Sequence, residues 1–122
     1  MEIHGRDIKF RRTVLATCEI AEKSPKGDVN QYDKLLQSKE YAVSQKAAAD
    51  FMGALSKGYE MAREFEEPGY KANPITAAEI LSLDDETFNG LFMEALRAWT
   101  GDALTTVEAE APKGKNVAGD SV

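Results

Sequence analysis

Residues 39–65 read KEYAVSQKAAADFMGALSKGYEMAREF, and this stretch decides the fold. It contains no proline, and its apolar residues return at steps of three and four, which is the period of one helix face. Asp50, Lys57 and Glu64 fall on the opposite side, as solvent requires. The stretch therefore predicts the longest helix of the protein, with an apolar stripe made of Ala48, Phe51, Met52, Leu55, Tyr59 and Ala62.

Two glycines, Gly53 and Gly58, interrupt this helical pattern. Each costs about 1 kcal/mol relative to alanine inside a helix. Such a cost indicates either a close crossing with another segment or a local kink. The sequence leaves both explanations open.

The beginning of the chain predicts a short β-hairpin and then a helix. Apolar and polar residues alternate over residues 2–10 around a turn with Gly5, and we expect Ile3, Ile8 and Phe10 to face inward. A first helix is expected over residues 13–23, before Pro25 breaks the pattern. Its expected inward face consists of Val14, Leu15, Cys18 and Ala21.

Capping patterns place the remaining helices. Asp28 and Gln31 resemble a capping box that opens a helix over about 29–37. After a proline-containing loop over 66–74, Thr76 and Glu79 form a second box. Asp84 or Asp85 caps a final helix that runs to Thr100, and Gly101 is placed to end it. The apolar face of that helix holds Phe88, Leu91, Phe92, Ala95, Leu96 and Trp99.

These patterns predict a mainly α fold, with a short N-terminal β-hairpin followed by about four or five helices. A chain of 122 residues has room for one compact domain, which we place at residues 1–101. Beyond Gly101 the helical period is lost and large apolar residues become sparse. Residues 102–122 are therefore expected to form a flexible, disordered tail.

Composition disfavours several classes of partner. The formal net charge of −6 opposes binding to nucleic acid, whose affinity comes largely from lysine and arginine. No apolar run approaches the roughly 20 residues that span a bilayer, and residues 1–7 lack the pattern of a secretory signal. The single cysteine, Cys18, fits a reducing compartment. We expect a cytoplasmic protein that binds neither membrane nor nucleic acid.

Reactive residues are few. His4 is the only histidine and is expected to lie exposed beside the hairpin turn, while Cys18 is expected to be buried and inert. The acidic clusters at 64–67 and 84–86 fall at helix ends, where the second suits a helix N-terminus. We predict no enzyme activity, and so no catalytic residue, metal site or cofactor.

The final helix is the candidate for partner binding. Its apolar face is wide for so small a domain, so part of it is expected to remain as a docking patch. A purely structural role in the core stays open as the alternative. The candidate partner-binding residues are Phe88, Leu91, Phe92, Leu96 and Trp99.

Most of the chain resembles the tail assembly chaperones of long-tailed, siphovirus-type bacteriophages and prophages. The likeness rests on the general texture of the sequence and on a final segment in which acidic residues are followed by lysines. The segments that carry it are Met1-Glu2-Ile3, residues 6–14 from Arg6 to Val14, Thr17-Cys18-Glu19-Ile20-Ala21-Glu22, Lys57-Gly58-Tyr59-Glu60 and Ala95-Leu96-Arg97-Ala98-Trp99.

This resemblance implies a function without catalysis. Copies of such a chaperone coat the helical tape-measure protein, keep it soluble and help to recruit tail-tube subunits, and members of the family self-associate. Two other classes stay open. One is a structural phage subunit, such as a connector at the head–tail junction. The other is a small enzyme or a DNA mimic, which would reveal itself by substrate turnover or by competition with DNA.

Overall fold

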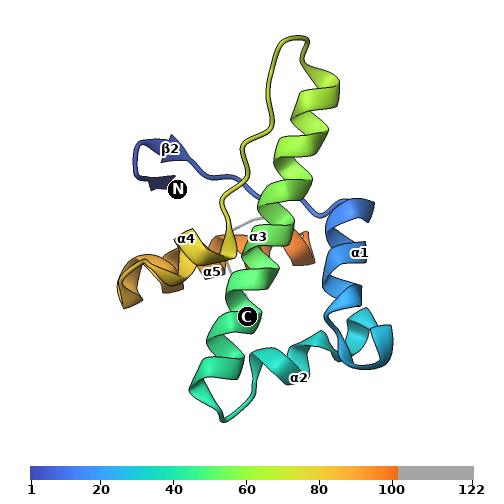
Figure 1. Ribbon diagram of the computed structural model, residues 1–122, viewed down its shortest axis with the longest axis vertical. Helices are drawn as coiled ribbons and strands as arrows, with labels where there is room; N and C mark the ends of the chain where they lie inside the picture. The colour runs from blue at the N-terminus through green and yellow to red at the C-terminus, as the bar shows by residue number, and fades with distance from the viewer. Residues whose placement is uncertain (102–122) are drawn as a thin grey trace, which may run out of the picture.

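A long central helix organises the protein, for which the computed structural model describes residues 1–101. This helix, α3 (Tyr41–Glu66), is contacted by α1 (Val14–Glu22), α2 (Tyr32–Leu36), α4 (Ala77–Leu81) and α5 (Asp85–Thr100). Figure 1 shows α5 running across α3, with α1 along one side and α2 at the lower end. The predicted mainly helical fold is confirmed. The tail predicted at residues 102–122 lies outside the described residues.

The predicted N-terminal hairpin is confirmed. Strand β1 (Glu2–Ile3) pairs antiparallel with β2 (Arg6–Asp7), and His4 and Gly5 take positive φ angles of 50° and 79° in the turn. Ile3 and Ile8 are buried, as predicted, and Phe10 is half-buried. An ion pair between Arg6 and Glu79, 2.9 Å long, ties the hairpin to α4. The hairpin is thus packed on the helical body.

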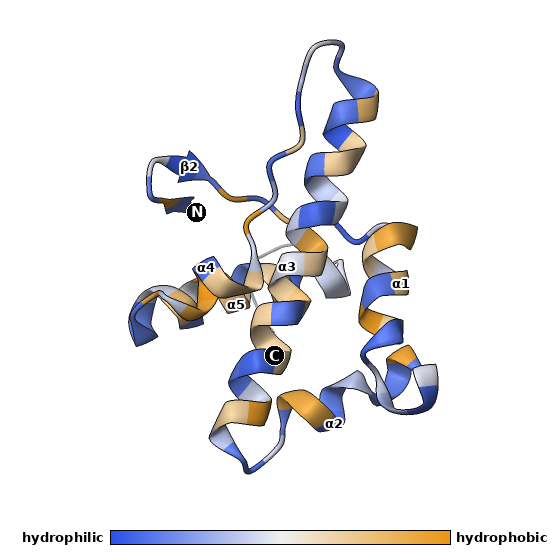
Figure 2. Cartoon of the chain, in the orientation of Figure 1, coloured by the Kyte–Doolittle hydropathy of each residue, from blue (hydrophilic) through white to orange (hydrophobic). Residues whose placement is uncertain are grey.

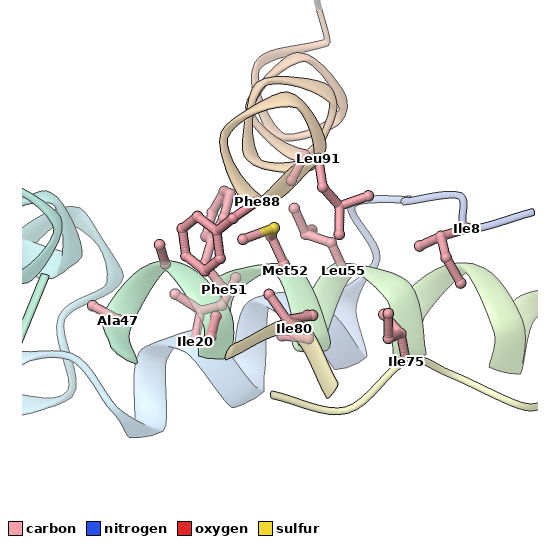
Figure 3. Close-up of a cluster of buried hydrophobic side chains, with 14 of the residues drawn as sticks. Ile8, Ile20, Ala47, Phe51, Met52, Leu55, Ile75, Ile80, Phe88 and Leu91 are labelled. Carbon is pink, nitrogen blue, oxygen red and sulfur yellow. The ribbon is translucent and has the colours of Figure 1, made fainter. Parts of the chain in front are cut away.

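The core lies where α5, α4 and the chain after β2 meet α3. Figure 3 shows Phe88 and Leu91 pointing from α5 toward Met52 and Leu55 of α3. Ile8, Ile75 and Ile80 close the sides of this cluster. Because neighbours contact α3 from several sides, its middle is buried well beyond the predicted stripe. The added buried positions are Ala47, Ala49, Ala54, Ser56, Gly58 and Glu60.

Gly58 marks a close crossing, which decides between the two explanations for that glycine. A Cβ atom at this position would lie 2.6 Å from the Arg11 carbonyl oxygen and 2.7 Å from the Thr13 hydroxyl. A Cβ at Gly53 would meet only ordinary contacts, the nearest at 3.7 Å to the Ala77 nitrogen. The segment before α1 therefore rests directly on the α3 backbone at Gly58, which only glycine permits.

The predicted inward face of α1 is wrong. Ala16 and Ile20 face the core, whereas Val14 is 81% exposed, Leu15 is 38% exposed and Cys18 is exposed. Apolar residues surround most of this short helix, so periodicity alone did not identify the buried side. The crossing at Gly58 decided it, because small Ala16 fits there, its Cβ only 3.2 Å from a Cβ built at Gly58.

Ion pairs hold the inner side of α1 in this orientation. Lys57 of α3 lies 2.7 Å from Glu19, and Lys23 lies 3.7 Å from Asp50. The first pair joins α1 to α3, and the second joins Lys23, the residue that follows α1, to α3. They oppose rotation of α1 about its own axis.

The helix in the connection from α1 to α3 is shorter than predicted, and the rest of the connection is less regular. Two 3₁₀ turns, η1 (Pro25–Gly27) and η2 (Val29–Gln31), precede α2. The Asp28 carboxylate accepts a hydrogen bond from the Asn30 N–H at 3.0 Å, and the Asp28 N–H donates to the Pro25 carbonyl oxygen rather than to the Gln31 side chain. The predicted capping box is therefore wrong, although Asp28 still caps the turn through Asn30, and the helix predicted over 29–37 begins as a 3₁₀ turn.

The ends of α4 and α5 follow the predicted capping. The Thr76 hydroxyl accepts from the Glu79 N–H, and the Glu79 carboxylate accepts from the Thr76 N–H. Asp84, rather than Asp85, caps α5 by accepting from the Thr87 N–H at 2.8 Å. Gly101 ends α5 with a φ of 78°, in the left-handed region.

These caps should make the fold sensitive to acid. Hydrogen bonds from Thr76, together with the Arg6 charge, hold the pKa of Glu79 below its ordinary 4.5, and the Thr87 N–H holds the pKa of Asp84 below 3.8. A carboxyl group whose pKa falls on folding stabilises the protein above its unfolded pKa, and that stabilisation is lost as pH falls through the folded value.

We therefore expect Tm to drop as the pH falls from about 5 to about 3, and to drop less in the double variant Glu79→Gln/Asp84→Asn. Asparagine caps a helix about as well as aspartate but does not titrate in this range. Thermal unfolding followed by circular dichroism measures the difference. Parallel pH profiles for the variant and the wild type would contradict the assignment.

Candidate partner-binding site

The structure divides the five predicted partner-binding residues into two groups. Phe88 and Leu91 are buried in the core, 7% and 0% exposed, so they present no surface to a partner. Phe92, Leu96 and Trp99 are half-buried along the edge of α5. The surface available on this helix is therefore the half that lies nearer its C-terminus.

A hollow of about 310 Å³ opens beside Leu96 and Trp99. Its walls come from α1, η2, α2, α3 and α5, so it lies where most helices of the protein meet. Most of the lining is apolar, with polar groups at a few points. The residues that line it are Arg12, Ile20, Val29, Asn30, Tyr32, Asp33, Leu36, Phe51, Leu96 and Trp99.

Phe51 is the aromatic centre behind this hollow. Its ring stacks on Tyr32 at a centroid distance of 6.2 Å and meets Phe92 and Trp99 edge to face at 6.0 and 5.5 Å. Stacked and edge-to-face pairs at these separations add stability beyond buried area. Phe51 is buried in α3, so the aromatic wall of the hollow is continuous with the core.

Arg12 holds Trp99 in position. The guanidinium lies 3.8 Å from the centroid of the indole ring and also donates a hydrogen bond to the Trp99 carbonyl oxygen at 3.0 Å. A cation over an indole face is attracted by the ring quadrupole. The contact joins the segment before α1 to the end of α5, and it places a positive charge at the rim of the hollow.

Tyr32 lines the hollow from α2, and its hydroxyl is held in a buried hydrogen bond. Its hydroxyl donates to the Ala47 carbonyl oxygen at 2.6 Å. Burial, aided by the nearby Asp50 charge, raises the pKa of Tyr32 far above its ordinary value. The hydroxyl therefore stays protonated and keeps its role as a donor. Asn30 and Asp33 are further polar residues of the lining.

Comparisons with protein-family models, with curated proteins and with solved structures give no match for this chain. The site has to be judged from its own geometry. That geometry suits apolar side chains: a concave, largely hydrophobic surface with a few polar groups at its edge is typical of a binding site.

The residues considered for chemistry lie apart from the hollow. His4 is exposed in the hairpin turn, and Cys18 lies on the outer side of α1. Within residues 1–101, no three His, Cys, Asp or Glu side chains lie close enough together to hold a metal ion. None of the helices in this part of the chain combines the length and apolar character of a membrane crossing.

Glu60 is the one carboxylate buried in the described part of the chain, and it has a structural role. It accepts hydrogen bonds from the Tyr70 hydroxyl and from the Asn73 N–H, the latter at 3.0 Å. Both donors belong to the loop after α3. Glu60 thus fastens that loop to α3.

The sequence alone did not predict most of the residues that line the hollow. No contact is predictable for Arg12 from its neighbours in the sequence, and Val29 and Leu36 lie in short segments whose period is weak. Tyr32 carried a signal, since an aromatic residue just after a capping pattern belongs on a packed face. Nothing local indicated that these residues would meet the end of α5.

Proposed function

We propose that this protein is a tail assembly chaperone of a long-tailed, siphovirus-type bacteriophage or prophage. It binds the helical tape-measure protein, keeps it soluble and helps to recruit tail-tube subunits. It acts in the cytoplasm of the bacterial host, without catalysis, and contacts neither nucleic acid nor membrane.

The hollow beside Leu96 and Trp99 carries this proposal. It is large enough, at about 310 Å³, to receive apolar side chains from one face of a client helix. Trp99 is an aromatic anchor of the kind that dominates binding energy at interfaces. The resemblance of the sequence to tail assembly chaperones supplies the identity of the client.

Charge supports the same role. The client helix would expose apolar residues until the tail is built, and exposed apolar surface causes aggregation. A chain of net charge −6 that covers this surface adds mutual repulsion between the coated complexes. The coated client therefore stays in solution.

A charge placed in the hollow tests the proposal. We expect Leu96→Asp to reduce capture of the co-expressed tape-measure protein by about tenfold or more, because a buried, unpaired carboxylate costs at least about 1.4 kcal/mol. The measurement is the amount of soluble client that co-purifies with the chaperone. Met93→Asp is the matched control, since Met93 lies on the same helix, is 49% exposed and does not line the hollow.

Circular dichroism has to show that both variants stay folded. Equal capture by folded Leu96→Asp protein and by the Met93→Asp control would refute the hollow as the client site. The alternative of a structural subunit, such as a head–tail connector, predicts that the protein remains in purified virus particles. A chaperone is absent from them.

A further inference from the structure

The outer side of α1 is an apolar surface that no part of residues 1–101 covers. Val14 is 81% exposed there, and Cys18 is exposed one turn further along. Figures 1 and 2 show α1 at the edge of the molecule, with orange, hydrophobic segments along it in Figure 2. A shallow hollow of about 420 Å³ follows this side, lined by Arg12, Thr13, Val14, Thr17, Cys18 and Ala21.

This surface has the shape to receive side chains from another segment. The inner side of α1 buries Ala16 and Ile20 against α3, so apolar residues occupy both sides of one nine-residue helix. A helix that is apolar on all sides is normally covered on all sides. Small side chains form the middle of the outer side, where they leave room for larger ones. These small residues are Thr17, Cys18 and Ala21.

The described part of the chain ends beside this surface. Near the end of α5, the Trp99 carbonyl oxygen accepts a hydrogen bond from Arg12 at 3.0 Å, and the Arg12 guanidinium lies 3.8 Å from the centroid of the indole ring. Arg12 also lines the hollow on α1, and Gly101 ends α5 just beyond Trp99. Figure 1 shows the orange end of α5 near the start of α1. The chain therefore continues into residue 102 close to the uncovered surface.

The residues that follow Gly101 have the side chains and the reach to cover α1. Leu104 and Val107 are the first large apolar residues of this segment. An extended chain advances about 3.3–3.6 Å per residue, so the six residues up to Val107 reach about 20 Å. The nine residues of α1 rise only about 14 Å. Residues 102–107 are therefore long enough to follow the hollow along the whole helix.

We propose that residues 102–107 cover the outer side of α1 in the same molecule, with Leu104 and Val107 in the hollow. The covalent connection favours this segment over any separate molecule, because a short tether gives an effective concentration in the millimolar range. A weak contact through two apolar side chains is then sufficient. A segment with few large apolar residues orders only against a surface that another part supplies, and α1 supplies it here.

Cys18 is the reporter for a direct test with the full-length protein, because it is the only cysteine and lines the hollow. Thiol reactivity requires access. We expect the double variant Leu104→Asn/Val107→Asn to react with N-ethylmaleimide at least about threefold faster than the wild type, because polar amides disfavour burial in the hollow. Val117→Asn is the matched control, since it makes the same change ten residues beyond Val107 and should leave the rate unchanged.

A disulfide tests whether the covering segment belongs to the same molecule. In full-length Val107→Cys protein, mild oxidation should join the new thiol to Cys18 within one chain, in a yield that does not depend on protein concentration. Adding Leu104→Asn should slow this closure about threefold or more. The length of the tether is the same in both proteins, so only the loss of binding in the hollow accounts for slower closure.

Three results would overturn the proposal, and none of them requires the client. One is an equal maleimide rate for the wild type and the double variant, which would mean that residues 102–107 do not shield Cys18. Another is closure of the Val107→Cys disulfide at the same rate with and without Leu104→Asn. The third is a wild-type maleimide rate that falls as protein concentration rises, which would mean that another copy covers α1 instead.

Discussion

Replacing Phe51 by alanine is expected to lower the free energy of unfolding by about 3–5 kcal/mol, the cost of removing a buried aromatic ring from a packed core. Phe51 is 2% exposed and contacts the rings of Tyr32, Phe92 and Trp99. Its loss would leave a cavity directly behind the hollow. Urea unfolding, followed by circular dichroism, measures the change.

The single tryptophan provides a second signal for the same variant. Trp99 meets Phe51 edge to face, so removal of that ring should expose the indole and shift its emission to longer wavelength. Phe51→Leu is the matched control, because it keeps most of the apolar volume and should cost less than about 1.5 kcal/mol. If the alanine and leucine variants were equally stable, the aromatic centre assigned to Phe51 would be wrong.

Replacing Gly58 by alanine is expected to destabilise the protein by about 1–3 kcal/mol, even though alanine favours the helix by about 1 kcal/mol. The new Cβ would lie 2.6 Å from the Arg11 carbonyl oxygen. That backbone has little freedom to move, since the Arg11 N–H donates to the Leu55 carbonyl oxygen at 3.1 Å. Thermal unfolding should show a Tm lower by about 4–8 °C for each kcal/mol.

Gly53→Ala makes a sharp comparison for that experiment. It is the same substitution in the same helix, but its Cβ would meet nothing nearer than 3.7 Å. We expect it to raise stability by up to about 1 kcal/mol through helix propensity. Two alanine variants of one helix should therefore shift Tm in opposite directions, and a rise in Tm for Gly58→Ala would disprove the close crossing.

The core and the candidate binding site share residues, so some substitutions should affect both stability and binding. Phe51 and Ile20 support the hollow from inside, whereas Leu96 lies at its half-buried surface. Substitutions at the first two positions should change stability and binding together. Substitution of Leu96 is expected to change binding with less effect on folding, which makes it the position of choice for tests of function.

The sequence predicted the helices well because their signals are local. The Thr76–Glu79 box, the Asp84 cap and the left-handed Gly101 depend on residues within four positions of one another, and all three are present. The sequence did less well in separating the buried residues of α5 from the half-buried ones. Its apolar face was predicted as one unit, but only contact with α3 separates buried Leu91 from half-buried Trp99.

The sequence by itself determined where α4 and α5 begin and where α5 ends, because hydrogen bonding, capping and apolar period act within a turn or two of the chain. Tertiary structure alone decided which side of α1 is buried and where the hollow opens. Both depend on contacts between distant residues, such as Arg12 with Trp99 and the Arg11 backbone with Gly58. Steric fit at such crossings is a property of three-dimensional distance, which no local pattern encodes.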